Sequence, residues 1–186
     1  MTRIFSLTLT LLLLASPVFA KSNQEKRDQI QEMSSKVLAR LYKEQPETKD
    51  IIRKASGYAT FSNIGVNVIF FSAGGGSGLV HNNKSGQETY MNMGTAGVGL
   101  GIGIKDFRAV FIFHDEKRMN SFIEDGWDFS GEADAAAKSG EKGAAGNAAG
   151  SMINGVSVYQ LTENGLAISA TLQGTKYWKS DKLNNK

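Results

Sequence analysis

The sequence predicts an α+β fold in which N-terminal helices precede a mostly antiparallel, strongly curved or barrel-like sheet that closes with a β-hairpin. Three observations lead to this prediction. Apolar residues recur at helical spacing over residues 24–44. From Gly57 onward the apolar period changes to two, as in strands. In the stretch 94–106, GTAGVGLGIGIKD, glycines alternate with apolar residues, which indicates a strand whose glycine face lets the sheet bend sharply.

Residues 1–20 have the pattern of a secretory signal peptide. Arg3 supplies the positive start, a short apolar run follows, and Val18 and Ala20 place small residues before a cleavage site at Lys21. The apolar run is too short for a membrane-spanning helix. We therefore expect residues 21–186 to be exported as one domain, in a bacterial periplasm or at the periphery of an envelope membrane.

The helical region is expected to be amphipathic. Ser22 or Asn23 can cap a helix over residues 24–44, and Gln45-Pro46 ends it. Its apolar stripe consists of Ile30, Met33, Val37, Leu38 and Leu41. This stripe can pack on the sheet or lie in a bilayer interface, and both readings stay open. A second short helix is predicted over residues 47–55.

A β-rich body is predicted over residues 57–178. Its strands are expected at 58–61, 66–71, 78–81, 87–91 and 108–113. The HNNKSG stretch at 81–86 is typical of a hairpin turn, and Asp115 caps a helix over 116–124. Residues 131–150, rich in alanine and glycine, are expected to form a flexible loop or a helical turn followed by a loop. Asn164-Gly165 then indicates the closing hairpin.

The motifs argue against an enzyme. The glycine spacing fits neither a phosphate-binding loop nor a dinucleotide fingerprint, and no hydrolase elbow occurs. Too few strands alternate for an outer-membrane protein. The chain lacks cysteine, and His81 and His114 show no metal spacing, so we expect no catalytic residue, no metal and no cofactor. Trp127 and Phe129 are expected in the core.

Both ends of the expected mature chain are basic, and its centre is acidic. Residues 21–54 hold nine basic and six acidic side chains, 174–186 hold four and one, and 55–173 hold seven and eleven. This asymmetry indicates that the ends face an anionic surface, random scatter being the alternative. The expected phosphate contacts are Lys26, Arg27, Lys36, Arg40, Lys43, Arg53 and Lys54, with Lys176, Lys179 and Lys182 as a second patch.

Five segments, in this order and spacing, resemble the SYLF domain family. They are IIRKASGYATFSNIG, SAGGGSGLV, GVGLGIGIKDFRAVFIF, GEADAAA and VSVYQLTENGLAISATLQGTKY, within residues 31–178. The resemblance implies a single lipid-binding domain over 21–186, with phosphoinositide binding in eukaryotic members and actin binding in some. It also implies that the amphipathic helix 24–44 and basic residues contact the membrane.

The chain departs from the family pattern at several positions. Ser62 replaces the usual proline, Val66 replaces a lysine, Ser72-Ala73 replaces two glycines, and KSGEKG replaces a Gly-Pro-x-Gly-Arg element. Two basic positions are therefore lost from the body. We expect general affinity for anionic phospholipid rather than for one phosphoinositide, and no nucleic-acid partner. The alternative is a periplasmic structural or interaction module that docks an envelope protein without lipid.

Overall fold

The computed structural model describes residues 21–63, 75–95, 108–128, 151–153, 155–162, 165–166 and 175–185. Several predictions lie outside these residues: the signal peptide, the strand at 66–71, the glycine-rich stretch beyond Thr95, the segment 131–150, Phe129 and the second half of the closing hairpin beyond Leu166.

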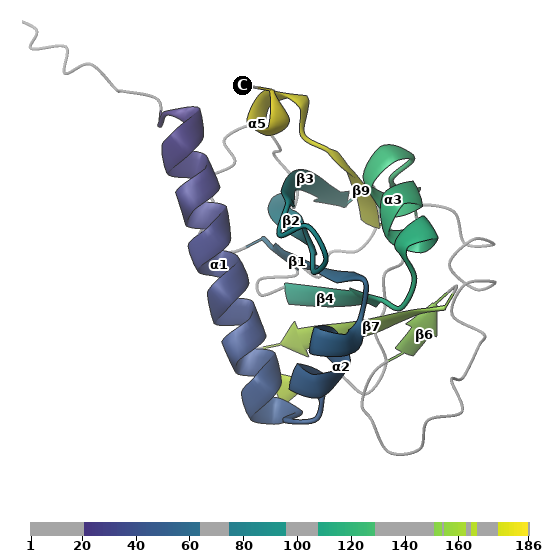
Figure 1. Cartoon of the computed structure of the whole chain (residues 1–186). Coiled ribbons are helices and arrows are strands. Elements are labelled where there is room, and N and C mark those ends of the chain that lie inside the picture. Colours follow the sequence, from purple (N-terminus) through teal and green to yellow (C-terminus); the bar gives the residue numbers. More distant parts are fainter. Residues whose placement is uncertain are drawn as a thin grey trace, which may run out of the picture.

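The described residues form helices and strands in the predicted order (Figure 1). The helices are α1 (Asn23–Glu44), α2 (Thr48–Lys54), α3 (Glu116–Glu124) and α5 (Asp181–Asn184). The strands are β1 (Gly57–Ser62), β2 (Gly76–Asn82), β3 (Glu88–Thr95), β4 (Arg108–Phe113), β5 (Trp127–Asp128), β6 (Ser151–Ile153), β7 (Val156–Thr162), β8 (Gly165–Leu166) and β9 (Thr175–Lys179). The order of helices, sheet and hairpin confirms the predicted α+β class.

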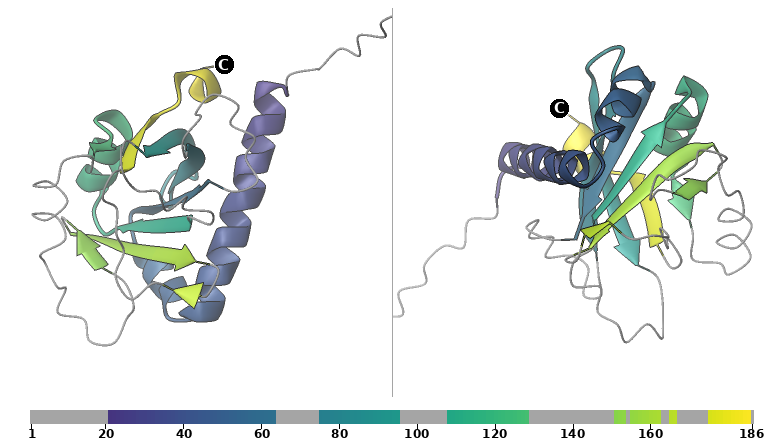
Figure 2. Two further views of the ribbon diagram at one scale, coloured as in Figure 1. Left: turned by 180° about the vertical axis from the view of Figure 1, so that it is seen from behind. Right: turned by 90° about the horizontal axis from the view of Figure 1, so that it is seen from below.

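One antiparallel sheet contains all nine described strands. Its order is β5-β9-β3-β2-β1-β4-β7-β6, with β8 paired to β7. The sheet is strongly curled, with α1 along one side and α3 on the other (Figure 2). The last strand, β9, pairs with β3, so that Met93 lies opposite Tyr177. The curved sheet and the start of the closing hairpin, where Leu161 pairs with Leu166, are thus as predicted.

The start of α1 is fixed by a capping box. The Ser22 hydroxyl accepts a hydrogen bond from the Glu25 amide at 3.1 Å, and the Ser22 amide donates to the Glu25 carboxylate at 2.6 Å. Two of the backbone donors that lack intrahelical partners at this end of the helix are therefore satisfied locally. The helix begins at Asn23, one residue before the predicted start, and Ser22 is the cap. In the same way, Asp115 accepts from the Arg118 amide and caps α3 at the predicted position.

The two faces of the sheet bury different side chains. Towards α1 the core is mainly aliphatic, and it consists of Ile30, Met33, Val37, Leu41, Ile52, Ala55, Leu79, Tyr90, Val110, Ile112, Tyr159, Leu161 and Leu183. Towards α3 the sheet curls around rings and methionines, with Phe61, Phe111, Phe113, Phe122, Tyr177, Met91, Met93 and Met119 at its centre and Trp127 packed against them. Trp127, which was predicted in the core, is partly buried and packs at the edge of this cluster.

Candidate functional site

The helix layer, which we define as α1, α2 and α5, covers one face of the sheet (Figure 2). The apolar stripe of α1 packs on that face: Ile30 is 1% exposed, Val37 2% and Leu41 0%. Of the two alternatives for the stripe, packing on the sheet or lying in a bilayer interface, the structure shows packing on the sheet. Any contact of α1 with a membrane in this arrangement is made by its polar side chains.

Six of the predicted cations lie on the helix layer with their charged groups available. Lys43, Lys54 and Lys182 are exposed and Lys26 is half-exposed, and none makes an ion pair with a described residue. Lys36 pairs with Glu32 at 2.6 Å and Arg53 with Asp50 at 3.0 Å. These two cationic side chains are 74% and 73% exposed, so their pairs are weak and open to exchange with another anion. The Lys36 ammonium, by its hydrogen bond, lowers the pKa of the Glu32 carboxyl.

Two predicted cations of α1 hold the fold together instead. Arg27 donates from Nε to the Leu183 carbonyl at 2.8 Å and from Nη2 to the Asn185 carbonyl at 3.2 Å, and it lies 6.0 Å from the centre of the Tyr90 ring. Arg40 donates to the Thr162 carbonyl. These contacts fasten α5 and the end of β7 to α1 across more than one hundred residues of chain.

The predicted second patch is divided by the structure. Lys176 pairs with Asp128 at 3.2 Å on the β5–β9 edge, and Lys179 pairs with Glu124 at 2.9 Å beside α3. Lys182 lies on α5, beside α1, and its carbonyl accepts a hydrogen bond from the Asn23 side chain of α1 at 3.1 Å. The structure thus brings Lys182 to the helix layer and leaves the other two lysines with carboxylate partners.

A groove runs between α1 and the ends of β1 and β4. Its volume is about 440 Å³, and it is lined by Gln29, Glu32, Met33, Lys36, Val37, Arg40, Ser62 and Arg108. Nη1 of Arg108 is buried and has no hydrogen-bond partner in the described part of the chain. The sequence did not predict a binding role for Arg108, because this residue begins a strand whose other residues are apolar. The sequence does contain one sign of such a role: Arg108 lies on the same strand face as the apolar residues Val110 and Ile112.

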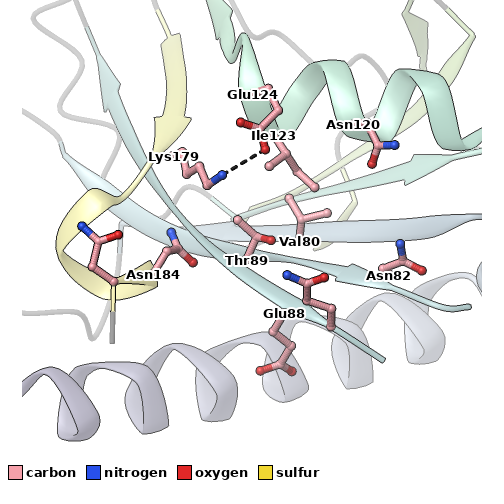
Figure 3. Close-up of a pocket in the computed structure, with 11 residues that line it drawn as sticks. Val80, Asn82, Glu88, Thr89, Asn120, Ile123, Glu124, Lys179 and Asn184 are labelled. Atoms are coloured by element: carbon pink, nitrogen blue, oxygen red, sulfur yellow. Dashed lines mark hydrogen bonds and ion pairs between the residues drawn. The ribbon is translucent and has the colours of Figure 1, made fainter. Parts of the chain in front are cut away.

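A second, polar pocket lies between β2, β3, α3 and α5 (Figure 3). Its volume is about 540 Å³, and amide side chains dominate its lining. Most of its polar groups already have structural partners: Asn184 bonds to both backbone groups of Tyr90, and Lys179 bonds to Glu124, as the dashed line in Figure 3 marks. Glu88 points away from the pocket towards α1, where it accepts from Gln31 at 2.6 Å. The charged side chains that line this pocket, Glu88, Glu124 and Lys179, therefore all have partners within the protein.

The histidines take structural positions. His81 stacks on Tyr58 with ring centres 5.1 Å apart, and His114 Nε2 lies 2.8 Å from the Ser157 hydroxyl. Among the described residues, no group of three acidic or histidine side chains is arranged to hold a metal ion. No helix in that part of the chain is both long and apolar enough to cross a membrane.

Comparison with known proteins gives two matches. Residues 94–186, half of the chain, match the family described as "Ysc84: Las17-binding protein actin regulator". Over 160 residues, 85% of this chain, the sequence is 36% identical to "Beta cell expansion factor A" of Aeromonas veronii. The chain spans 59% of the length of that relative. The SYLF resemblance is thereby confirmed, and the chain belongs to the Ysc84, or SYLF, family.

Proposed function

We propose that the protein is a non-enzymatic lipid-binding module that attaches peripherally to anionic phospholipid. The observation that carries the proposal is the distribution of partners among its cations. On the helix layer, Lys26, Lys43, Lys54 and Lys182 make no ion pair with described residues. Beside α3 and β9, Arg118, Lys176 and Lys179 each pair with a carboxylate within 3.2 Å.

The physics of this contact is electrostatic. A basic residue close to an anionic membrane contributes about 1 kcal/mol, so several together give binding that salt weakens. Because the stripe of α1 is buried against the sheet, the bound protein would stay at the surface without inserting apolar side chains. Attachment of this kind is reversible.

Membership of the family supports a lipid-binding or protein-interaction module in general. The finer part of the proposal is that the lipid is any anionic phospholipid rather than one phosphoinositide. The family description names a protein-binding actin regulator, which favours a protein partner as the second candidate. We propose that this partner would be an envelope protein. In either case we propose that residues 1–20 export the chain to the periplasm or the face of an envelope membrane.

The experiment is flotation of the protein, in the form that its own host produces, with two kinds of vesicles. One kind contains neutral phospholipid only, and the other is rich in phosphatidylglycerol. The test variant replaces Lys26, Lys43 and Lys54 by glutamine. The matched control replaces Lys117, Lys176 and Lys179 by glutamine, which removes the same charge from the side of α3 and β9.

At low salt, we expect the test variant to bind anionic vesicles about 100-fold more weakly, because three contacts of about 1 kcal/mol are lost. The control should change less than about threefold, since two of its three lysines are already neutralised by partners. Equal losses in both variants would contradict the assignment to the helix layer. Absence of vesicle binding together with salt-insensitive capture of one envelope protein would establish the second candidate instead.

A further inference from the structure

We infer that the groove between α1 and the ends of β1 and β4 is a binding site for a phosphate monoester group, with Arg108 as its central donor. The inference rests on the proposed function in one respect: a lipid headgroup is one source of such a group, and a free phosphorylated small molecule is the other. It assigns a new residue and a defined chemistry to a surface that otherwise offers only diffuse charge.

The first observation concerns the position of Arg108. In the sheet it lies opposite Ser62 of β1 and opposite Leu161 of β7. Alternation along β4 puts Arg108 on the same face as Val110 and Ile112, which is the face that α1 covers. The guanidinium therefore lies at the end of the helix–sheet interface, where the groove opens.

The second observation is the unsatisfied hydrogen-bonding capacity of this guanidinium. Its Nη1 is buried without a partner among the described residues, although a buried charged donor without a hydrogen bond is costly. An anion in the groove would remove this cost once the guanidinium turned its buried Nη1 towards it. The planar fork of the guanidinium suits the paired oxygens of a phosphate group.

The third observation is the charge of the groove. Lys36, Arg40 and Arg108 line it together with one carboxylate, Glu32. Three cations and one anion leave a net charge of +2. A phosphate monoester carries about −1.5 to −2 near pH 7 and would balance that charge, whereas a phosphodiester or a carboxylate would leave about half of it uncompensated. Lys36 can turn to the ligand because its pair with Glu32 is solvent-exposed.

The fourth observation is size. At about 440 Å³ the groove is within the range of sites for small molecules and is large enough for a phosphate with its attached headgroup atoms. The lining also includes Met33 and Val37 of α1, which give the groove an apolar wall beside its cations. This combination suits a ligand with a charged head and a less polar neighbouring portion.

The test is calorimetric titration of the purified protein with three soluble probes. Dihexanoyl phosphatidic acid presents a lipid phosphate monoester, dihexanoyl phosphatidylglycerol a lipid phosphodiester, and inorganic phosphate the bare group. The variants are Arg108→Gln and Arg108→Leu. The matched control is Arg118→Gln, which removes a guanidinium that Asp115 holds at 2.9 Å beside α3.

We expect phosphatidic acid to bind at least about tenfold more tightly than phosphatidylglycerol, and both Arg108 variants to weaken it by about tenfold or more, because a charge-assisted hydrogen bond is lost. Arg118→Gln should leave the affinity unchanged. Arg108→Leu should keep or raise the midpoint of thermal unfolding, because it removes an unpaired buried donor. If Arg108→Leu unfolds the protein while Arg108→Gln binds phosphatidic acid normally, the arginine is structural and the inference is wrong.

The outcomes for this site and for the proposed function can be told apart. Binding of soluble phosphatidic acid or inorganic phosphate through Arg108, without affinity for anionic vesicles, would support the site and overturn peripheral attachment. Vesicle binding that is identical in wild type and Arg108→Gln, without affinity for any soluble probe, would overturn the site and leave the proposed function standing. Equal affinity for the monoester and diester probes would overturn the choice of ligand class.

Discussion

The two sides of the sheet are built on different principles. Beside α3, rings pack edge to face, as Phe61 does with Phe111 at 5.7 Å between ring centres, and three of the neighbouring cations, Arg118, Lys176 and Lys179, are paired with carboxylates. Beside the helix layer, the core is mainly aliphatic, and several cations make no ion pair with described residues. A surface whose charges are mutually neutralised contributes little to binding an anionic partner. The comparison supports our proposal that the helix layer carries the interaction while the α3 side serves stability.

The largest expected effect tests the stability half of this comparison. Phe111 is fully buried and contacts the rings of Phe61, Phe122, Trp127 and Tyr177. We expect Phe111→Ala to lower the free energy of unfolding by about 3–5 kcal/mol, because a large cavity replaces the ring. Leu41→Ala, a deletion in the core under α1, should cost about 2–5 kcal/mol. Urea unfolding followed by circular dichroism measures both changes.

These two deletions also test whether the sides unfold together. Phe111 and Val110 are neighbours on β4 and face opposite cores, so both cores depend on the same sheet. We therefore expect the loss of either core to unfold the whole sheet. A single transition in both variants is the expected result. Both variants would carry Trp178→Phe, so that fluorescence reports Trp127 alone. Separate transitions for this fluorescence and for helix content, in either variant, would mean that the helix layer detaches by itself and would contradict the comparison.

A smaller effect is expected from the buried phenols at alkaline pH. Burial, and to a lesser extent Tyr42 and Glu88, raise the pKa of Tyr58 from its ordinary value of 10.0 to about 12. The folded protein thus keeps this phenol neutral while the unfolded chain ionises it. The stabilisation is complete below pH 10 and is lost as the pH rises towards 12. Burial also raises the pKa of Tyr177, on the α3 side.

We therefore expect the stability of the wild type to fall between pH 10 and 12, and Tyr58→Phe to remove about 1–2 kcal/mol of that fall. Tyr177→Phe should remove more, because Tyr177 is 0% exposed whereas Tyr58 is only half-buried. Chemical unfolding at a series of pH values measures the slopes. A larger effect from Tyr58 than from Tyr177 would contradict the tighter burial of the α3 side.

Local features of the fold could be predicted from the sequence. The helical period, the caps at Ser22 and Asp115, and the apolar strand β4 are properties of neighbouring residues, and the structure reproduces each of them. The pairing of Met93 with Tyr177 joins segments more than eighty residues apart, and no local pattern encodes it. Likewise, the apolar run of β4 indicated a buried strand but could not reveal that different cores lie on its two faces.

The candidate site was harder to predict for the same reason. The sequence predicted Arg27 and Arg40 as phosphate contacts, but the structure pairs them with backbone carbonyls of residues 162, 183 and 185, more than one hundred residues away. Lys176 and Lys179 looked equivalent to Lys182 in sequence, yet only the first two meet carboxylates. Charge can be counted from a sequence, whereas the partner that neutralises each charge depends on tertiary contacts.

The last prediction concerns α1 itself, and its expected effect is none. The hydroxyls of Ser34 on α1 and Thr60 on β1 are hydrogen-bonded at 2.8 Å inside the helix–sheet interface. Since the chain has no cysteine, Ser34→Cys with Thr60→Cys offers a single disulfide that pins α1 to the sheet. Thiol titration would verify that the bond has formed.

If the protein binds membranes through the exposed charges of the helix layer, the oxidised double variant should float with phosphatidylglycerol vesicles as well as its reduced form does. The pinned helix still presents Lys26, Lys36 and Lys43, whose exposure does not depend on movement of the apolar stripe. Loss of binding on oxidation, restored by reduction, would mean that α1 must leave the sheet and insert Ile30, Val37 and Leu41 into the bilayer. The sheet face beneath α1 would then cover the apolar stripe of a membrane anchor until α1 is released. The two sides of the sheet would differ in function because α1 moves, and not because of their charges.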